Sequence, residues 1–238
     1  MKRSICRAAA LTGVMTAFAA FPAHAGLVTF DDLSPNLYFP GDAFVSGGLN
    51  FSLSPQFLSV PQPGFGTVDT AAGLSSFSNA PTGNSTQFYA GLNDNSVTMS
   101  AGSQVFVLAS FDFGFVPPVG TSGSSSPGAL IAYWTDAFGA TGFSGFDFGS
   151  ADSNGDWAFL RANMAAPSFS SGAPTTVDFQ SVTFFACLYS GPECNRPANN
   201  QAQFALDNIT ANVPLPSSLL LAGLGLAGLV VTRRRVAV

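Results

Sequence analysis

The sequence predicts an all-β fold, an antiparallel β-sandwich of jelly-roll type, and three observations support this prediction. Short segments rich in β-branched and aromatic residues recur between clusters of glycine, proline, asparagine and serine. Only 9% of the residues are charged, and no long segment before the C-terminal tail has helical periodicity. Phe111–Phe115 and Phe146–Gly149 alternate strictly, so their phenylalanine rings share one face of a strand. Many short strands in one domain favour two packed sheets.

The expected strands have the length and the β-branched or aromatic content of this element type. They cover residues 27–30, 43–53, 87–91, 97–99, 105–115, 130–135, 158–161, 182–189 and 204–211. Turn-forming residues separate them, and the serine-rich stretch 120–128 is expected to be a flexible loop.

The N-terminus has the three regions of a secretory signal peptide. Basic residues precede an apolar stretch over 8–21, and small residues at Ala23 and Ala25 then fit a signal peptidase. We predict that this enzyme removes residues 1–25 and that residues 26–212 form one extracellular domain. A retained N-terminal anchor is the alternative.

The C-terminal tail, residues 213–238, combines a proline motif, an apolar run over 219–231 and a basic end. Counted from Ser217, the run spans only about 23 Å as a helix, against a hydrocarbon core of roughly 30 Å. The arginines predict that this end stays in the cytoplasm and that the domain lies outside. We therefore expect one hydrophobic helix that anchors the chain transiently in the inner membrane, with a buried core helix as the alternative.

This tail resembles the PEP-CTERM sorting signal of Gram-negative bacteria. Leu215 stands where the commonest form has glutamate, and residues 203–209 resemble the Gln-Phe-x-x-Asp pattern of one subgroup. The resemblance implies cleavage by an exosortase, a membrane-embedded cysteine protease, and export coupled to extracellular polysaccharide, with a final place at the cell surface or in a biofilm matrix. The residues that carry it are the sorting motif Val213, Pro214, Leu215 and Pro216 and the stop-transfer residues Arg233, Arg234 and Arg235.

The domain between the two ends is strongly acidic. Arg161 and Arg196 stand against all 13 acidic residues, which gives a net charge of −11. This charge argues against nucleic acid or an anionic membrane as a partner. Solubility outside the cell and cation binding are the two interpretations.

The domain also lacks histidine and lysine, because His24 is lost with the signal peptide. Ser-His-Asp and Cys-His nucleophile systems, histidine-ligated zinc and Schiff-base lysines are therefore excluded. Carboxylate chemistry remains, in which an acidic pair acts as in glycosidases or binds calcium. We expect no enzyme, since Glu193 is the sole glutamate and lies in a hairpin. A secreted glycan-active hydrolase using an aspartate pair, or a calcium-dependent carbohydrate-binding module, is the alternative.

Cys187 and Cys194 are expected to form a disulfide. They are the two cysteines left after removal of the signal peptide, and a Ser190-Gly191-Pro192 turn lies between them. An even number of cysteines in an oxidising compartment favours a bridge. Metal ligation or a free nucleophile is the alternative.

Calcium is the one cofactor that the sequence suggests, and its first candidate site is a glycine turn. Asp152, Asn154 and Asp156 place carboxylate and amide oxygens along it. A bidentate glutamate is missing, so a plain Asx-rich hairpin turn is the alternative.

A second candidate calcium site joins the two ends of the domain. Asp31 and Asp32 follow the first expected strand, and Asp207 lies in the last. Terminal strands of jelly rolls often lie side by side, which would bring three carboxylates together. Such carboxylates need a cation between them, or else they are solvated turn residues.

Broad aromatic rings are candidates for a sugar-binding platform. Trp134 and Trp157 are the first choice, and Tyr133, Tyr89 and Tyr38 are further candidates by residue type. Packing in the core is the alternative for each of them. The sequence therefore predicts a non-catalytic surface protein associated with extracellular polysaccharide.

Overall fold

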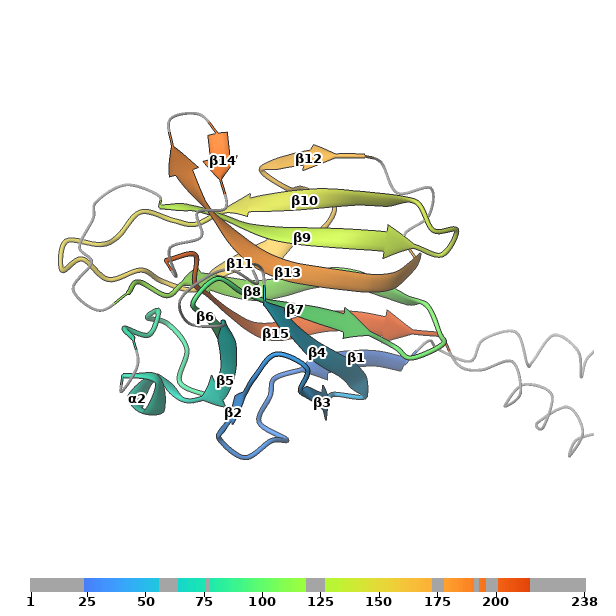
Figure 1. Cartoon of the computed structure of the whole chain (residues 1–238), viewed down its shortest axis with the longest axis horizontal. Coiled ribbons are helices and arrows are strands. Elements are labelled where there is room, and N and C mark those ends of the chain that lie inside the picture. The colour runs from blue at the N-terminus through green and yellow to red at the C-terminus, as the bar shows by residue number, and fades with distance from the viewer. Residues whose placement is uncertain are drawn as a thin grey trace, which may run out of the picture. The chain divides into compact units, whose positions relative to one another are not determined.

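In the described residues, one continuous antiparallel sheet of 15 strands folds into two layers, which we call the first and second sheets (Figure 1). The two layers enclose the largest of three apolar clusters. The computed structural model describes residues 24–55, 64–75, 78–118, 127–172, 178–190, 193–195 and 201–214. Ala25–Pro214 form one compact unit. The all-β prediction is confirmed, since the one helix in the described ranges is the short α2 (Ala71–Leu74), capped by the Thr70 side chain.

In the first sheet, most neighbouring strands are not consecutive in the sequence. From one edge to the other it contains β12 (Phe169–Ser171), β10 (Thr141–Asp147), β9 (Gly128–Asp136), β13 (Asp178–Ser190), β7 (Asn95–Ser100), β4 (Leu49–Pro55) and β3 (Ala43–Ser46). The short β14 (Glu193–Asn195) extends β13 as a hairpin.

The second sheet brings the first and last described strands together. Its order is β11 (Leu160–Asn163), β8 (Phe106–Phe115), β15 (Phe204–Val213), β6 (Phe88–Leu92), β5 (Phe65–Asp69) and β2 (Asn36–Tyr38). β1 (His24–Val28) also pairs with β15. The two sheets meet where Asp178 and Phe179 of β13 pair with β8.

Strand alternation builds the core as the sequence predicts. Phe111, Phe113 and Phe115 of β8 are buried between the sheets, while Asp112 lies on the other face. Edge-on contacts between rings fill this space, such as Phe111 against Phe184 at a centroid distance of 5.1 Å.

Some expected strands differ from those observed. The segment 43–53 is divided into β3 and β4 because Gly47 and Gly48 adopt positive φ angles of 56° and 80°, which suit a tight hairpin turn. β2, β5, β12 and β14 were not expected, and β10 was expected only at its end, through the alternation at residues 146–149. β2, β12 and β14 have three residues each, which is too short to show a pattern.

The disulfide prediction is confirmed. Cys187 of β13 and Cys194 of β14 are bonded, with their Cα atoms 5.4 Å apart. The bridge holds the β14 hairpin onto the longest strand of the first sheet.

Most of the predicted signal peptide and sorting tail lies outside the described residues, which begin at His24 and end at Pro214. The predicted cleavage after Ala25 falls within β1. β15 ends at Val213, the first residue of the predicted sorting motif. Across the described ranges, no helix has the length and hydrophobicity needed to cross a bilayer.

Candidate functional site

The outer face of the first sheet carries a set of uncharged hydroxyl and amide groups. Inward-facing residues such as Trp134, Val182 and Met99 join the core, so their neighbours point outward. We call this set the hydroxyl face, and it consists of Asn50, Ser52, Thr98, Ser100, Tyr133, Thr135, Ser181 and Thr183. All of these residues are half-buried or exposed.

Strand register arranges the hydroxyl face in rows. Tyr133, Thr183, Thr98 and Ser52 are cross-strand partners in β9, β13, β7 and β4. The hydroxyls of Thr98 and Thr183 are hydrogen-bonded at 2.9 Å. Four neighbouring strands make a row about 14 Å long. The face is therefore an extended polar strip.

An aromatic group borders one end of this strip. The Tyr133 side chain is 39% exposed, and Phe143 lies directly opposite it in β10. Phe143 packs edge-on against Phe169 of β12 at a centroid distance of 6.2 Å. The face thus combines a solvent-accessible ring, supported by apolar neighbours, with many hydrogen-bonding groups.

The prediction that Trp134 and Trp157 form a surface platform is wrong. Their exposed fractions are 1% and 3%. Trp134 lies on the face of β9 that points into the core, and Trp157 packs on Phe115 with ring centroids 5.2 Å apart. Tyr89 and Tyr38 are buried as well. Of these five predicted aromatics, Tyr133 is the one that reaches the surface.

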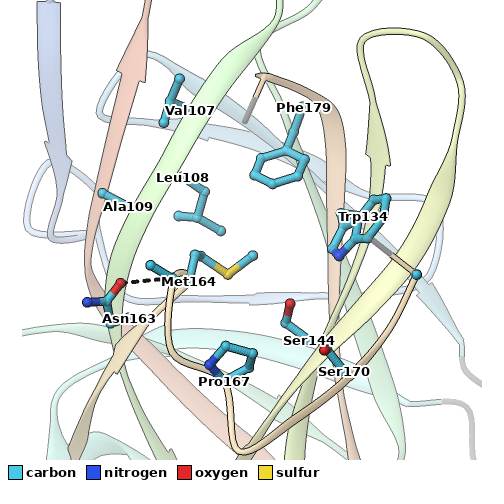
Figure 2. A pocket seen from close by; sticks show the side chains of 12 residues that line it. Val107, Leu108, Ala109, Trp134, Ser144, Asn163, Met164, Pro167, Ser170 and Phe179 are labelled. Carbon is cyan, nitrogen blue, oxygen red and sulfur yellow. Dashed lines mark hydrogen bonds between the residues drawn. The ribbon is translucent and has the colours of Figure 1, made fainter. Parts of the chain in front are cut away.

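Trp134 lines a cavity of about 490 Å³ between the sheets (Figure 2). Leu108, Met164 and Phe179 line it together with Trp134, and the segment that connects β11 to β12 forms one wall. Ser144 supplies one of its few polar groups. No acidic residue is among the described residues that line it, so the cavity offers no carboxyl pair for glycoside hydrolysis.

A separate polar cluster forms where β15 changes neighbours. β15 pairs with β6 through Phe204–Leu206, and β1 pairs with β15 as well. Asp207 follows directly on the β6-paired segment, and Asp31 follows β1. Both carboxylates contact the same short segment, because the Thr86 hydroxyl donates to Asp207 Oδ2 and the backbone N–H of the next residue, Gln87, donates to Asp31 Oδ1.

The Asp207 side chain is fully buried and only partly hydrogen-bonded. Its Oδ2 accepts from Asn84 Nδ2 at 2.6 Å and from the Thr86 hydroxyl at 3.3 Å. Its Oδ1 has no hydrogen-bond partner among the described residues. Burial raises the pKa of Asp207 to about 6, and the hydrogen bonds offset part of that effect.

Gln87 belongs to the same cluster. Its backbone N–H donates to Asp31 Oδ1 at 3.1 Å, and its Nε2 donates to the Leu33 carbonyl at 3.0 Å. Its Oε1 is buried and, like Asp207 Oδ1, receives no hydrogen bond from any part of the chain that the structure describes. Sequence reasoning missed this residue.

The prediction that Asp32 joins this cluster is wrong. Its carboxylate accepts from the Ser46 hydroxyl at 2.5 Å and from the Gly47 N–H at 3.0 Å, on the β3–β4 turn. Two carboxylates meet instead of three. In the described ranges, no group of three or more Asp, Glu, His or Cys side chains is placed to hold a metal.

In the other predicted calcium site, Asp152 is engaged by its own turn. Its Oδ1 accepts the backbone N–H groups of Asn154 at 2.8 Å and of Asp156 at 2.9 Å. These donors hold the pKa of Asp152 below its usual value. The contacts are those of an Asx-rich turn, and calcium binding there stays a prediction.

Comparison with known protein families identifies one motif, at the C-terminal end of the chain. The family described as the PEP-CTERM protein-sorting motif matches residues 212–235. No curated protein matches the chain.

The solved structures that the chain matches include carbohydrate-binding modules. One is the CBM22-1–GH10 part of xylanase 10B from Clostridium thermocellum in complex with xylohexaose, at 11% identity and a TM-score of 0.36, covering 82% of this chain and 29% of that chain. Another is the CBM22-1 xylan-binding domain of Paenibacillus barcinonensis Xyn10C, at 12% identity and a TM-score of 0.31, covering 82% of this chain and 98% of that one. This chain spans less than a third of the first of them.

Proposed function

We propose that this chain is an exported, non-catalytic protein, whose β-sandwich of jelly-roll type binds neutral extracellular polysaccharide along the hydroxyl face. Signal peptidase removes residues 1–25, and an exosortase processes the tail at Val213–Pro216. The observation that carries the export step is the sorting motif at residues 212–235. The uncharged hydroxyl face carries the binding step.

The chemistry of the face matches a sugar chain. Pyranose hydroxyls both donate and accept hydrogen bonds, as do the threonine and serine hydroxyls arranged in register across β4, β7, β13 and β9. The exposed ring of Tyr133 offers an apolar surface for the C–H face of a sugar. A domain of net charge −11 repels an acidic polymer, which favours a neutral one.

A glycan-active hydrolase is the alternative, and the geometry favours binding without turnover. A hydrolase needs a general acid, which is a carboxyl with a raised pKa. Among the described carboxyls with a clear shift, the pKa of Asp207 is raised and that of Asp152 is lowered. The Asp207 side chain is fully buried against Asn84 and Thr86, so a substrate does not reach it. Release of reducing sugar from the producing strain's polysaccharide would overturn the non-catalytic assignment.

Binding is tested by affinity electrophoresis of the full-length protein in gels that contain the producing strain's neutral polysaccharide. Tyr133→Ala should weaken retention about tenfold, equivalent to ~1.4 kcal/mol. Ser170→Ala, at the cavity between the sheets, is the matched control and should bind as the unchanged protein does. Equal retention of the unchanged protein and Tyr133→Ala would exclude the hydroxyl face.

Sorting is tested separately in cells. Fractionation of wild-type and exosortase-deficient strains, with intact-mass measurement, should show a product truncated near Pro214 in the wild type alone. The deficient strain should keep the chain in its inner membrane through the stop-transfer arginines. A full-length product in both strains would contradict processing.

A further inference from the structure

We infer that Asp31 and Asp207 hold a calcium ion at the junction of β1, β6 and β15, with Gln87 Oε1 as a third side-chain ligand. This site is separate from the hydroxyl face, and it does not depend on polysaccharide binding. The hydrogen-bonding state of its oxygens is the observation that carries the inference.

Two buried acceptor oxygens at the junction have no donor. Asp207 Oδ1 and Gln87 Oε1 both lack a hydrogen-bond partner within the described ranges, and the Asp207 side chain is fully buried. Buried polar atoms without partners are rare in folded proteins and are costly when they carry charge. Both atoms are acceptors, so the missing partner is electropositive.

The protein donors around these oxygens are already engaged. Asn84 Nδ2 and the Thr86 hydroxyl donate to the other oxygen of Asp207. The Asn208 backbone N–H also donates to the Asp207 carboxyl, and the Gln87 backbone N–H donates to Asp31. Arg161 is the nearby arginine, and its guanidinium binds Asp112 at 2.9 Å and the Asn208 carbonyl at 3.0 Å. No described side chain is left to neutralise the carboxylate pair.

The available ligands specify the class of cation. They are carboxylate and amide oxygens, which suit a hard divalent ion, and the domain has no histidine to attract a softer metal. Calcium accepts six to eight oxygens in flexible geometry, so waters on the exposed side of Asp31 can complete the shell. Two carboxylates predict a dissociation constant of about 10⁻⁴–10⁻³ M, the range of extracellular calcium modules.

Backbone geometry sets the position of both carboxylates. Phe30, before Asp31, and Asn208, after Asp207, adopt positive φ angles of 58° and 48°. Non-glycine residues rarely adopt this conformation, and here it accompanies the change of neighbour along β15. A cation at this point ties the segment after β1 to the last strand of the domain.

The test is thermal unfolding of the full-length protein in non-ionic detergent, followed by tryptophan fluorescence, in excess calcium chloride and in excess EGTA. At calcium about a hundredfold above the dissociation constant, the midpoint should rise by roughly 5–10 °C. Asp207→Asn and, independently, the exposed Asp31→Asn should abolish the rise. Asp156→Asn, in the other candidate turn, should keep it in full. Calorimetric titration should give one calcium per chain.

Three results would overturn the site. They are a midpoint that calcium leaves unchanged, a rise of equal size in Asp207→Asn, and loss of the rise in Asp156→Asn, which would place the ion in the turn at residues 152–156. None of them bears on polysaccharide retention, which Tyr133→Ala tests. The two proposals therefore fail separately.

Discussion

Replacing Asp207 with asparagine should stabilise the calcium-free protein at neutral pH. Burial raises the Asp207 pKa from 3.8 to about 6, so the ionised form is disfavoured in the fold. This shift in pKa corresponds to ~3 kcal/mol at most, and relaxation of the surroundings around a buried charge reduces the expected gain to about 1–2 kcal/mol. Asparagine keeps an oxygen for Asn84 and Thr86, and its Nδ2 can donate to Asp31.

The sign follows from proton linkage. A carboxyl whose pKa is raised in the fold contributes stability that is fully present below pH 3.8 and is lost as pH rises through about 6. Asparagine does not ionise, so the variant loses no stability at this position between pH 3.8 and about pH 6. The variant should therefore match the unchanged protein near pH 4 and exceed it at pH 7.

Urea denaturation in EGTA at several pH values measures the difference. The difference between the unfolding free energies of the two proteins at each pH isolates the effect of Asp207, because their other charged groups are the same. The charged neighbours of Asp207 are Asp31, after β1, and the ion pair of Asp112 on β8 with Arg161 on β11. Asp156→Asn, an exposed control, should give no gain at either pH. A variant that is less stable at pH 7, or a gain that is independent of pH, would refute the reasoning.

Three further outcomes are expected. Calcium affinity, measured by calorimetric titration, should rise between pH 5 and pH 7, because a proton on Asp207 competes with the ion below about 6. Replacing both Cys187 and Cys194 with serine should lower the free energy of unfolding by about 2–3 kcal/mol for so short a loop, as measured in urea. Trp134→Ala should cost about 3–5 kcal/mol because it empties a core position, whereas Tyr133→Ala should cost less than about 1 kcal/mol in the same assay.

The contrast between Trp134 and Tyr133 shows where sequence reasoning stops. Residues 128–134 of β9 form a nearly continuous apolar run, so alternation does not reveal which side faces the core. Ile131, on the outer face with Tyr133, is also buried, because Phe185 and Phe169 cover it. Pairing with β10 and β13 determines which side chains of β9 face the core. These pairings join segments far apart in the sequence, so the sequence of β9 alone does not reveal them.

The carboxylate junction was predicted in part for a physical reason. Asp31 and Asp207 come together because β1 and β15 are paired, as expected of terminal strands in a sandwich. Asp32 was misplaced because the left-handed Phe30 turns the chain, and its carboxylate then meets the β3–β4 turn. Gln87 had no sequence signal, since its role depends on β6 and β1 both pairing with β15.

β15 links the proposed calcium site to the sorting motif. Asp207 lies within it, and it ends at Val213, just inside the sorting motif matched over residues 212–235. Pro214 has no N–H to continue the ladder and is exposed, so hydrogen bonding to the sheet stops at the first proline of the motif. A protease that acts at this motif therefore finds backbone outside the sheet, while the ladder to β8 holds the preceding residues in the domain. Cleavage there would release the folded sandwich with its proposed calcium ligands intact.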